Sequence, residues 1–201
     1  MRKMIPGVLV LAAAFWMVMQ VAMAAALESA KIGDAAPNFT LQDDQGKSVS
    51  LADYSGKIVV LEWTNPTCPF VQRHYKEQTF VKLADKYKDK NVVWIAVNST
   101  AKSSNAINHQ WAEQNKLAYA ILNDSEGKVG RAYGATNTPD MFIIDAKGKL
   151  AYMGGIDDDP EGNRGSARVN YVDKALSELT TDAQVSTPQT KPYGCGIRYA
   201  H

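Results

Sequence analysis

The chain has few of the residues that hold metals or build disulfide scaffolds: two cysteines and three histidines occur among 201 residues. Two cysteines are too few for a disulfide-stabilised scaffold, and His74, His109 and His201 lack the spacing of zinc ligands. No Cys-x-x-Cys-His sequence is present for covalent haem attachment. We therefore expect no metal ion and no organic cofactor, which leaves Cys68 and Cys195 as candidate reactive groups.

An excess of charge of one sign is also lacking, because 22 Lys and Arg residues stand against 21 Asp and Glu residues. Nucleic-acid binding favours a concentrated positive field, so we expect no nucleic-acid partner. After residue 24, no apolar run approaches the roughly 20 residues that span a bilayer. We expect this part of the chain to be soluble.

One long apolar run does occur, at the N-terminus. Arg2 and Lys3 precede an uninterrupted apolar stretch over residues 8–19, and residues 22–25 (Ala-Met-Ala-Ala) offer the small side chains of a cleavage site. The pattern predicts a secretory signal peptide over residues 1–24 and a periplasmic or secreted protein. An uncleaved membrane anchor is the alternative, and membrane contact is expected only in that case.

The rest of the chain is long enough for one well-buried core. We expect one domain over residues 30–180 and an extended tail over residues 181–201 that carries Cys195. The hydrophobic patterns predict strands at 38–42, 48–51, 57–63, 91–97, 118–122, 141–144 and 150–153, and helices at 69–87, 105–115, 128–133 and 170–180. This order indicates an α/β fold with a central mixed sheet flanked by helices and an N-terminal β-hairpin.

Cys68 follows a buried strand and directly precedes a predicted helix. Pro69 suits the first helical position, because the N–H that proline lacks would be unpaired there. The free N–H groups and the positive end of the helix favour a thiolate at Cys68, and the thiolate is the nucleophilic form. We predict that Cys68 is the reactive group and that Trp63 and Pro69, on either side of this loop, contact the substrate; an inert buried cysteine is the alternative.

A second loop, ending in Thr138 and Pro139, directly precedes the predicted strand at 141–144. A proline before a central strand is a natural place for a cis peptide bond. Thr138 and Pro139 are predicted to offer backbone groups to an extended substrate peptide. An ordinary trans turn is the alternative.

These motifs together resemble the thioredoxin-like redoxin family, the group of alkyl hydroperoxide reductases and thiol-specific antioxidants. The resemblance is carried by the runs at 32–39, 51–57 and 59–69 and by the Thr-Pro pair. The run at 187–199 is similar to a peroxiredoxin-like subgroup with a C-terminal Tyr-Gly-Cys tail. The resemblance spans about residues 30–199 and implies a thioredoxin-like fold and a thiol-dependent oxidoreductase.

The chain departs from both familiar cysteine motifs. Thioredoxins carry Cys-x-x-Cys, whereas residues 68–71 read Cys-Pro-Phe-Val, so the local resolving thiol is missing. Peroxiredoxins carry Pro-x-x-x-Thr-x-x-Cys, whereas Leu61 and Asn65 stand at the Pro and Thr positions. The hydroxyl that helps to seat a peroxide is therefore absent from its expected place.

Two further residues acquire roles from the resemblance. Glu62 matches a buried acid of thioredoxins that relays protons, and burial would raise its pKa toward neutrality; a carboxylate that reaches water is the alternative. Cys195 is implied as the resolving thiol. A structural bridge to Cys68 and pairing across a dimer are the alternatives for Cys195.

The function we predict is an exported thiol–disulfide oxidoreductase. Cys68 attacks a protein disulfide or a hydroperoxide, Cys195 resolves the product, Glu62 assists proton transfer, and an external thiol reductant restores the protein. A peroxiredoxin-type hydroperoxide reductase is one alternative. The other is a redox-inactive binding module of the same fold with a structural disulfide.

Overall fold

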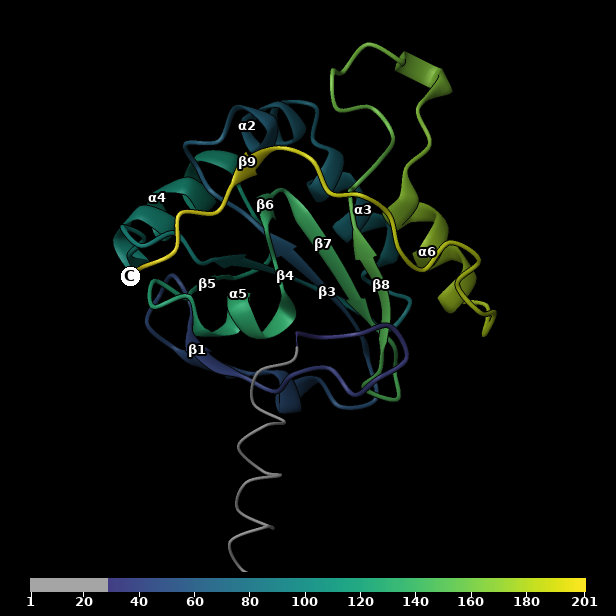
Figure 1. Ribbon diagram of the computed structural model, residues 1–201, viewed down its shortest axis with the longest axis horizontal. Coiled ribbons are helices and arrows are strands. Elements are labelled where there is room, and N and C mark those ends of the chain that lie inside the picture. The colour runs from purple at the N-terminus through teal and green to yellow at the C-terminus, as the bar shows by residue number, and fades with distance from the viewer. Residues whose placement is uncertain (1–28) are drawn as a thin grey trace, which may run out of the picture.

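The computed structural model describes residues 29–201 (Figure 1). The predicted signal peptide at 1–24 lies outside the described residues. Within residues 29–201, no helix has both the length and the apolar character needed to cross a bilayer.

A central sheet of seven strands has the order β2-β1-β5-β4-β3-β7-β8. The sheet is mixed, as predicted: β3 is parallel to β4 and β4 to β5, while the other neighbouring pairs are antiparallel. The strands are β1 Thr40–Gln42, β2 Ser48–Ser50, β3 Ile58–Trp63, β4 Val92–Asn98, β5 Ile121–Asn123, β7 Asp140–Ile144 and β8 Leu150–Gly154. The predicted N-terminal hairpin is confirmed in β1 and β2.

The α-helices cover both faces of this sheet (Figure 1). They are α2 Pro69–Lys76, α3 Thr79–Tyr87, α4 Asn105–Asn115, α5 Lys128–Tyr133 and α6 Tyr171–Leu179, with short 3-10 turns at Leu51–Tyr54 and Gly165–Ala167. The single helix predicted over 69–87 is wrong, because Gln78 adopts a left-handed conformation with φ 58° and separates α2 from α3. Neither glycine nor proline marks this break in the sequence.

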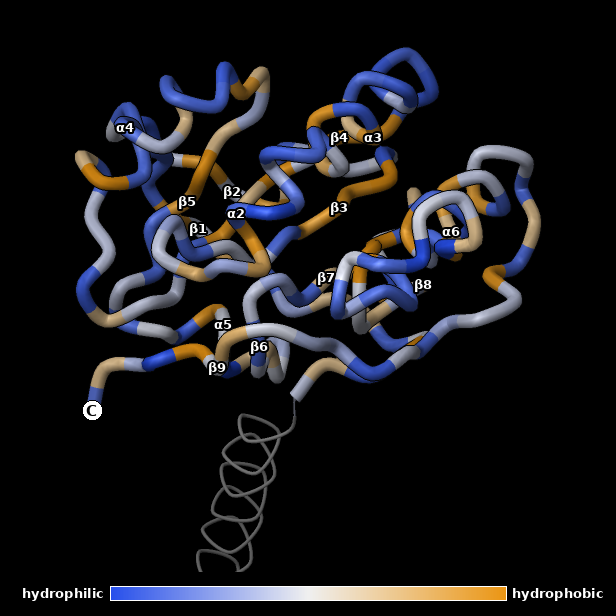
Figure 2. Tube along the Cα trace, turned by 90° about the horizontal axis from the view of Figure 1, so that it is seen from above, coloured by the Kyte–Doolittle hydropathy of each residue, from blue (hydrophilic) through white to orange (hydrophobic). Residues whose placement is uncertain are grey.

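Alternating side chains of β3 divide the core into two layers. Ile58 and Val60 face the cluster formed with α2, α3 and α6, whereas Val59 and Leu61 face the cluster formed with α5 and the hairpin. All four are buried, so the strand reads as continuously apolar although its side chains point to opposite faces. Figure 2 shows the hydrophobic residues concentrated along these central strands.

The C-terminal tail is extended, as predicted, and lies along the domain. Its first part runs beside β8, where the N–H of Met153 donates to the carbonyl of Pro188 at 3.0 Å and the N–H of Thr190 donates to the carbonyl of Met153 at 3.1 Å. Its last part forms β9, Cys195–Gly196, which pairs antiparallel with β6, Asn137–Thr138. Figure 1 shows this yellow segment passing between β6 and α2.

Candidate active site

Cys68 is the N-cap residue of α2, and Pro69 occupies the first helical position, as predicted. The loop before it is built by Asn65, whose side-chain oxygen accepts hydrogen bonds from the N–H and the hydroxyl of Thr67 at 3.0 and 2.9 Å. The N–H of Cys68 donates to the Asn65 carbonyl at 3.0 Å. The position that peroxiredoxins give to threonine is therefore used here to shape the turn that leads into the helix.

Cys195 lies directly against Cys68. The two sulfur atoms are 2.8 Å apart, and both residues are free thiols. A disulfide bond of about 2.05 Å needs only a small further approach. The structure thus brings together two cysteines that are 127 positions apart in the sequence.

Gly194 allows this approach. Its φ is 117°, and a Cβ atom built there would lie 2.1 Å from the carbonyl oxygen of Thr138. Only glycine accommodates both the backbone angle and the close contact. The Tyr-Gly-Cys sequence therefore has a steric reason for its central residue.

The two thiols have opposite pKa shifts. Burial acts to raise the pKa of Cys68, but hydrogen bonds from the side chains of Cys195 and Thr138 and from the backbone at Val71 and Cys195 outweigh it and lower that pKa. Burial, followed by the hydrogen bond and charge of Cys68, raises the pKa of Cys195 to about 11. Cys68 is therefore the more acidic thiol of the pair and the first of the two to lose its proton as the pH rises.

The peptide bond between Thr138 and Pro139 is cis, as the sequence suggested. Both residues are buried, and the carbonyl oxygen of Thr138 lies 3.0 Å from the sulfur of Cys68. Cys195 is the residue that pairs with Thr138 across β6 and β9. The tail thus covers the loop predicted to receive substrate, whereas Pro69 remains exposed beside it.

Glu62 is fully buried in the layer that also contains α2. Its carboxylate accepts hydrogen bonds from the Tyr75 hydroxyl at 2.8 Å, the Trp94 indole at 2.9 Å and the Tyr119 hydroxyl at 3.4 Å. Burial raises its pKa to about 7, against the lowering effect of these donors. Tyr75, on the helix that Cys68 caps, connects Glu62 to that helix; no direct hydrogen bond joins Glu62 to either cysteine within the described chain.

Trp63 lies on the opposite face of the sheet. Its indole N–H donates to the Ser99 hydroxyl at 3.0 Å, and its ring packs against Tyr133 and Phe142 at centroid distances of 5.3 and 4.9 Å. The side chain has no exposed surface, so its position supports a packing role rather than the substrate contact we expected.

The sequence did not reveal one polar cluster near the cysteines. It consists of His74, Arg73 and Tyr193. The hydroxyl of Tyr193 lies 2.8 Å from Nε2 of His74 and 3.3 Å from Nη2 of Arg73. The only sequence signal was the position of Tyr193 in the Tyr-Gly-Cys run. Over residues 29–201, no group of three or more His, Cys, Asp or Glu side chains is arranged to hold a metal ion.

A cysteine of lowered pKa at the start of a helix, beside a cis-proline loop on a central mixed sheet, defines a thioredoxin-like redox protein. The AhpC/TSA family model matches residues 32–153, and the chain belongs to this family. It is a thiol-dependent oxidoreductase.

The relatives found by sequence and by structure agree with this class. The chain is 32% identical over 124 residues to the thiol-disulfide oxidoreductase ResA of Bacillus thuringiensis subsp. konkukian, which covers 61% of this chain and 69% of the relative. An uncharacterized conserved protein from Geobacillus kaustophilus superimposes with a TM-score of 0.76 at 30% identity, covering 85% of this chain and 93% of its own. A putative thiol:disulfide interchange protein DsbE from Chlorobium tepidum gives a TM-score of 0.54 at 30% identity over 62% of this chain and 85% of its own.

Proposed function

We propose that this protein is an exported thiol–disulfide oxidoreductase in which Cys68 is the nucleophile and Cys195 is the resolving thiol. The observation that supports the pair most directly is the 2.8 Å separation of the two sulfur atoms. The opposite pKa shifts support Cys68 as the nucleophile and Cys195 as the thiol that keeps its proton longer.

The reaction proceeds by two thiol–disulfide exchanges. The Cys68 thiolate attacks one sulfur of a partner protein's disulfide, forms a mixed disulfide and releases the other partner sulfur as a thiolate. Cys195, after losing its proton, attacks the sulfur of Cys68, closes the internal disulfide and releases the second partner thiolate. The partner gains two electrons, and an external thiol reductant returns Cys68 and Cys195 to the dithiol form.

The tail has to move during this cycle, because Cys68 is 1% exposed beneath it. Local release of the β9 pairing uncovers Cys68, Thr138 and Pro139 together. We assign substrate positioning to Thr138, Pro139 and the exposed Pro69. The return of the tail then delivers Cys195 to the mixed disulfide.

Glu62 is proposed to assist proton transfer to and from the thiol pair. Its pKa of about 7 allows it to exchange a proton near neutrality. The Tyr75 hydroxyl, 2.8 Å from the carboxylate and on the helix that Cys68 caps, is the proposed first group of the path.

Titration in glutathione buffers of defined ratio tests the thiol couple, with acid quenching and mass spectrometry of the trapped species. We expect wild type to form the internal disulfide at a potential above about −300 mV, the region of working redox couples. We expect C195S to accumulate a mixed disulfide on Cys68, and C68S to form none at that position. A potential well below about −300 mV would instead identify a structural bridge and a redox-inactive binding module.

Stopped-flow mixing with hydrogen peroxide separates disulfide exchange from peroxidase activity. We expect slow loss of the Cys68 thiol, because Asn65 provides no hydroxyl at the position used by peroxiredoxins and is already bonded to Thr67. Rapid loss would identify a hydroperoxide reductase.

Export is tested by N-terminal sequencing of the protein purified from its native host. The small residues at 22–25 and the apolar run before them support cleavage after residue 24. We expect the mature chain to begin at Ala25, in a compartment where disulfides persist. A chain that begins at Met1 in the membrane fraction would identify an uncleaved anchor.

A further inference from the structure

Tyr193 lies two residues before Cys195 in the sequence, and its side chain packs against helix α2. Its hydroxyl donates to Oδ1 of Asp157 at 2.5 Å and lies 2.8 Å from Nε2 of His74. Its ring packs against Phe70 at a centroid distance of 6.0 Å, and the guanidinium of Arg73 lies 6.0 Å above the ring. Three of these partners belong to the helix that Cys68 caps.

Polar groups surround the Tyr193 hydroxyl on three sides. A phenol has one hydrogen, which the Tyr193 hydroxyl donates to the Asp157 carboxylate, and its oxygen accepts from Nη2 of Arg73 at 3.3 Å. Nε2 of His74 lies 2.8 Å from the same hydroxyl and 3.2 Å from Nη2 of Arg73, and Nδ1 of His74 lies 3.3 Å from the Thr79 hydroxyl. Burial, followed by the charge of Arg73, lowers the pKa of His74 to about 4, so the imidazole is neutral near pH 7.

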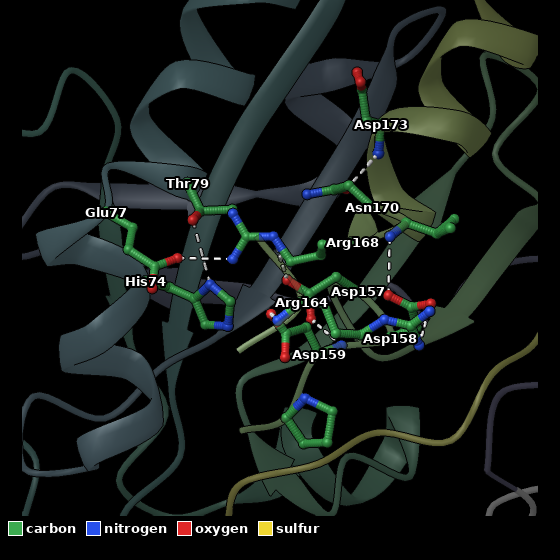
Figure 3. Close-up of polar contacts among 12 residues, drawn as sticks. His74, Glu77, Thr79, Asp157, Asp158, Asp159, Arg164, Arg168, Asn170 and Asp173 are labelled. Atoms are coloured by element: carbon green, nitrogen blue, oxygen red, sulfur yellow. Dashed lines mark hydrogen bonds and ion pairs between the residues drawn. The ribbon is translucent and has the colours of Figure 1, made fainter. Parts of the chain in front are cut away.

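The residues that contact Tyr193 also make hydrogen bonds and ion pairs with other residues. Arg73 donates to the carbonyls of Asp159 and Pro160 at 2.9 and 2.8 Å. Arg168 pairs with Glu77 at 2.7 Å, and Nε of Arg168 lies 3.6 Å from the Asp157 carboxylate. Figure 3 shows His74 of α2 and Glu77 of the turn after it lying near Asp157, Asp159 and Arg168 of the segment after β8. The residues around the phenol, Phe70, Arg73, His74 and Asp157, are here called the Tyr193 socket. Contacts of their own position them for the phenol.

We propose that Tyr193 is a positioning residue that sets the sulfur of Cys195 against Cys68 by tying the tail to α2. This inference rests on the proposed function. Within residues 29–201, the other hydrogen bonds of the tail go to residues outside α2. Thr190 near the start of the tail bonds to Met153, and Tyr199 near its end bonds to Ala135. In the described part of the chain, Tyr193 is the one tail residue that is hydrogen-bonded to α2, apart from the contact between the two sulfur atoms.

The consequence of this role is an effect on the redox equilibrium. Removing the phenol hydroxyl takes one hydrogen bond from the buried Asp157 carboxylate and one partner from the buried His74 imidazole, which is unfavourable in any state with the tail in place. The dithiol protein can escape this cost by releasing the tail, whereas the disulfide holds the tail in place covalently. The substitution therefore favours the dithiol and lowers the effective concentration of Cys195 at Cys68.

The test compares Y193F with wild type in the same glutathione titration of the full-length protein. We expect the equilibrium constant for closing the disulfide to fall about tenfold, which raises the potential by about 30 mV. The matched control is Y133F, because the Tyr133 side chain is also buried and its hydroxyl is hydrogen-bonded, but to a partner outside the tail, the Pro37 carbonyl at 2.8 Å. We expect Y133F to leave the potential unchanged.

Hydrogen exchange supplies an independent readout in the dithiol form. The N–H of Ile197 donates to the Thr136 carbonyl at 3.0 Å, so its protection reports the docked tail. We expect this N–H to exchange about tenfold faster in Y193F and at the wild-type rate in Y133F. A Y193F potential and exchange rate equal to those of wild type overturn this inference while leaving the Cys68–Cys195 couple intact. Failure of wild type to form the disulfide overturns the proposed function itself.

Discussion

Glu62 shows how a single buried carboxyl group couples chemistry to stability. Three donors face it, yet burial dominates and the pKa rises to about 7 from 4.5. A group whose folded pKa is raised binds its proton more tightly in the folded chain than in the unfolded chain. Between these two values, the folded protein therefore loses stability as the pH rises.

Replacing Glu62 by Gln removes this titration. Relative to E62Q, we expect the free energy of unfolding of wild type to fall from about pH 4.5 to about pH 7, by a total on the order of 3 kcal/mol, and to stay level above that. Urea unfolding at a series of pH values under reducing conditions measures the difference. Taking the difference cancels Asp140, whose pKa burial also raises to about 7. Parallel curves for the two proteins would contradict the assignment.

The lowered pKa of Cys68 depends on its neighbour. Because the side chain of Cys195 donates to the thiolate, we expect the pKa of Cys68 to rise in C195A. In C195S the hydroxyl can still donate, so the pKa should stay nearer that of wild type. Ultraviolet absorbance of the thiolate against pH measures both variants. Identical titration of Cys68 in wild type and C195A would assign the lowered pKa to the helix end instead.

Among the elements, β9 depends most on one small residue. A Cβ atom at Gly194 would meet the Thr138 carbonyl at 2.1 Å, whereas a Cβ atom at Gly196 meets nothing within 4 Å. We expect G194A to displace β9, to destabilise the dithiol protein by about 1–3 kcal/mol and to increase the rate at which Ellman's reagent modifies Cys68 at least tenfold. G196A is the matched control and should retain the wild-type rate. Equal rates in the two variants would show that the tail does not shield Cys68.

Most elements were predictable because their signals are local. The buried strands have continuous apolar runs, and Pro69 after Cys68 marks the start of α2. The break at Gln78 was not predictable, because no glycine or proline signals its left-handed backbone. The burial of Glu62 could be read from its strand, whereas the Tyr193 socket joins segments more than 100 positions apart and leaves no local pattern.

The whole molecule is changed by closing one bond between distant residues. A disulfide between positions 127 apart restricts the unfolded chain and stabilises the folded one by up to about 5 kcal/mol in the chain-entropy description. We expect the oxidised wild type to unfold at a higher urea concentration than the reduced form. C195S should give the same midpoint with and without oxidant. Equal midpoints for oxidised and reduced wild type would show that the bridge strains the native state.

The pairing of β9 with β6 makes the C-terminal tail a competitor for the Thr138 backbone, which we propose as a substrate-positioning group. Any foreign strand that bonds to the Thr138 backbone must wait for β9 to leave, so apparent affinity equals intrinsic affinity multiplied by the fraction of chains in which β9 is detached. The factor is the same for every partner, so it lowers all apparent affinities in proportion, and only partners of high intrinsic affinity still occupy the site at a given concentration.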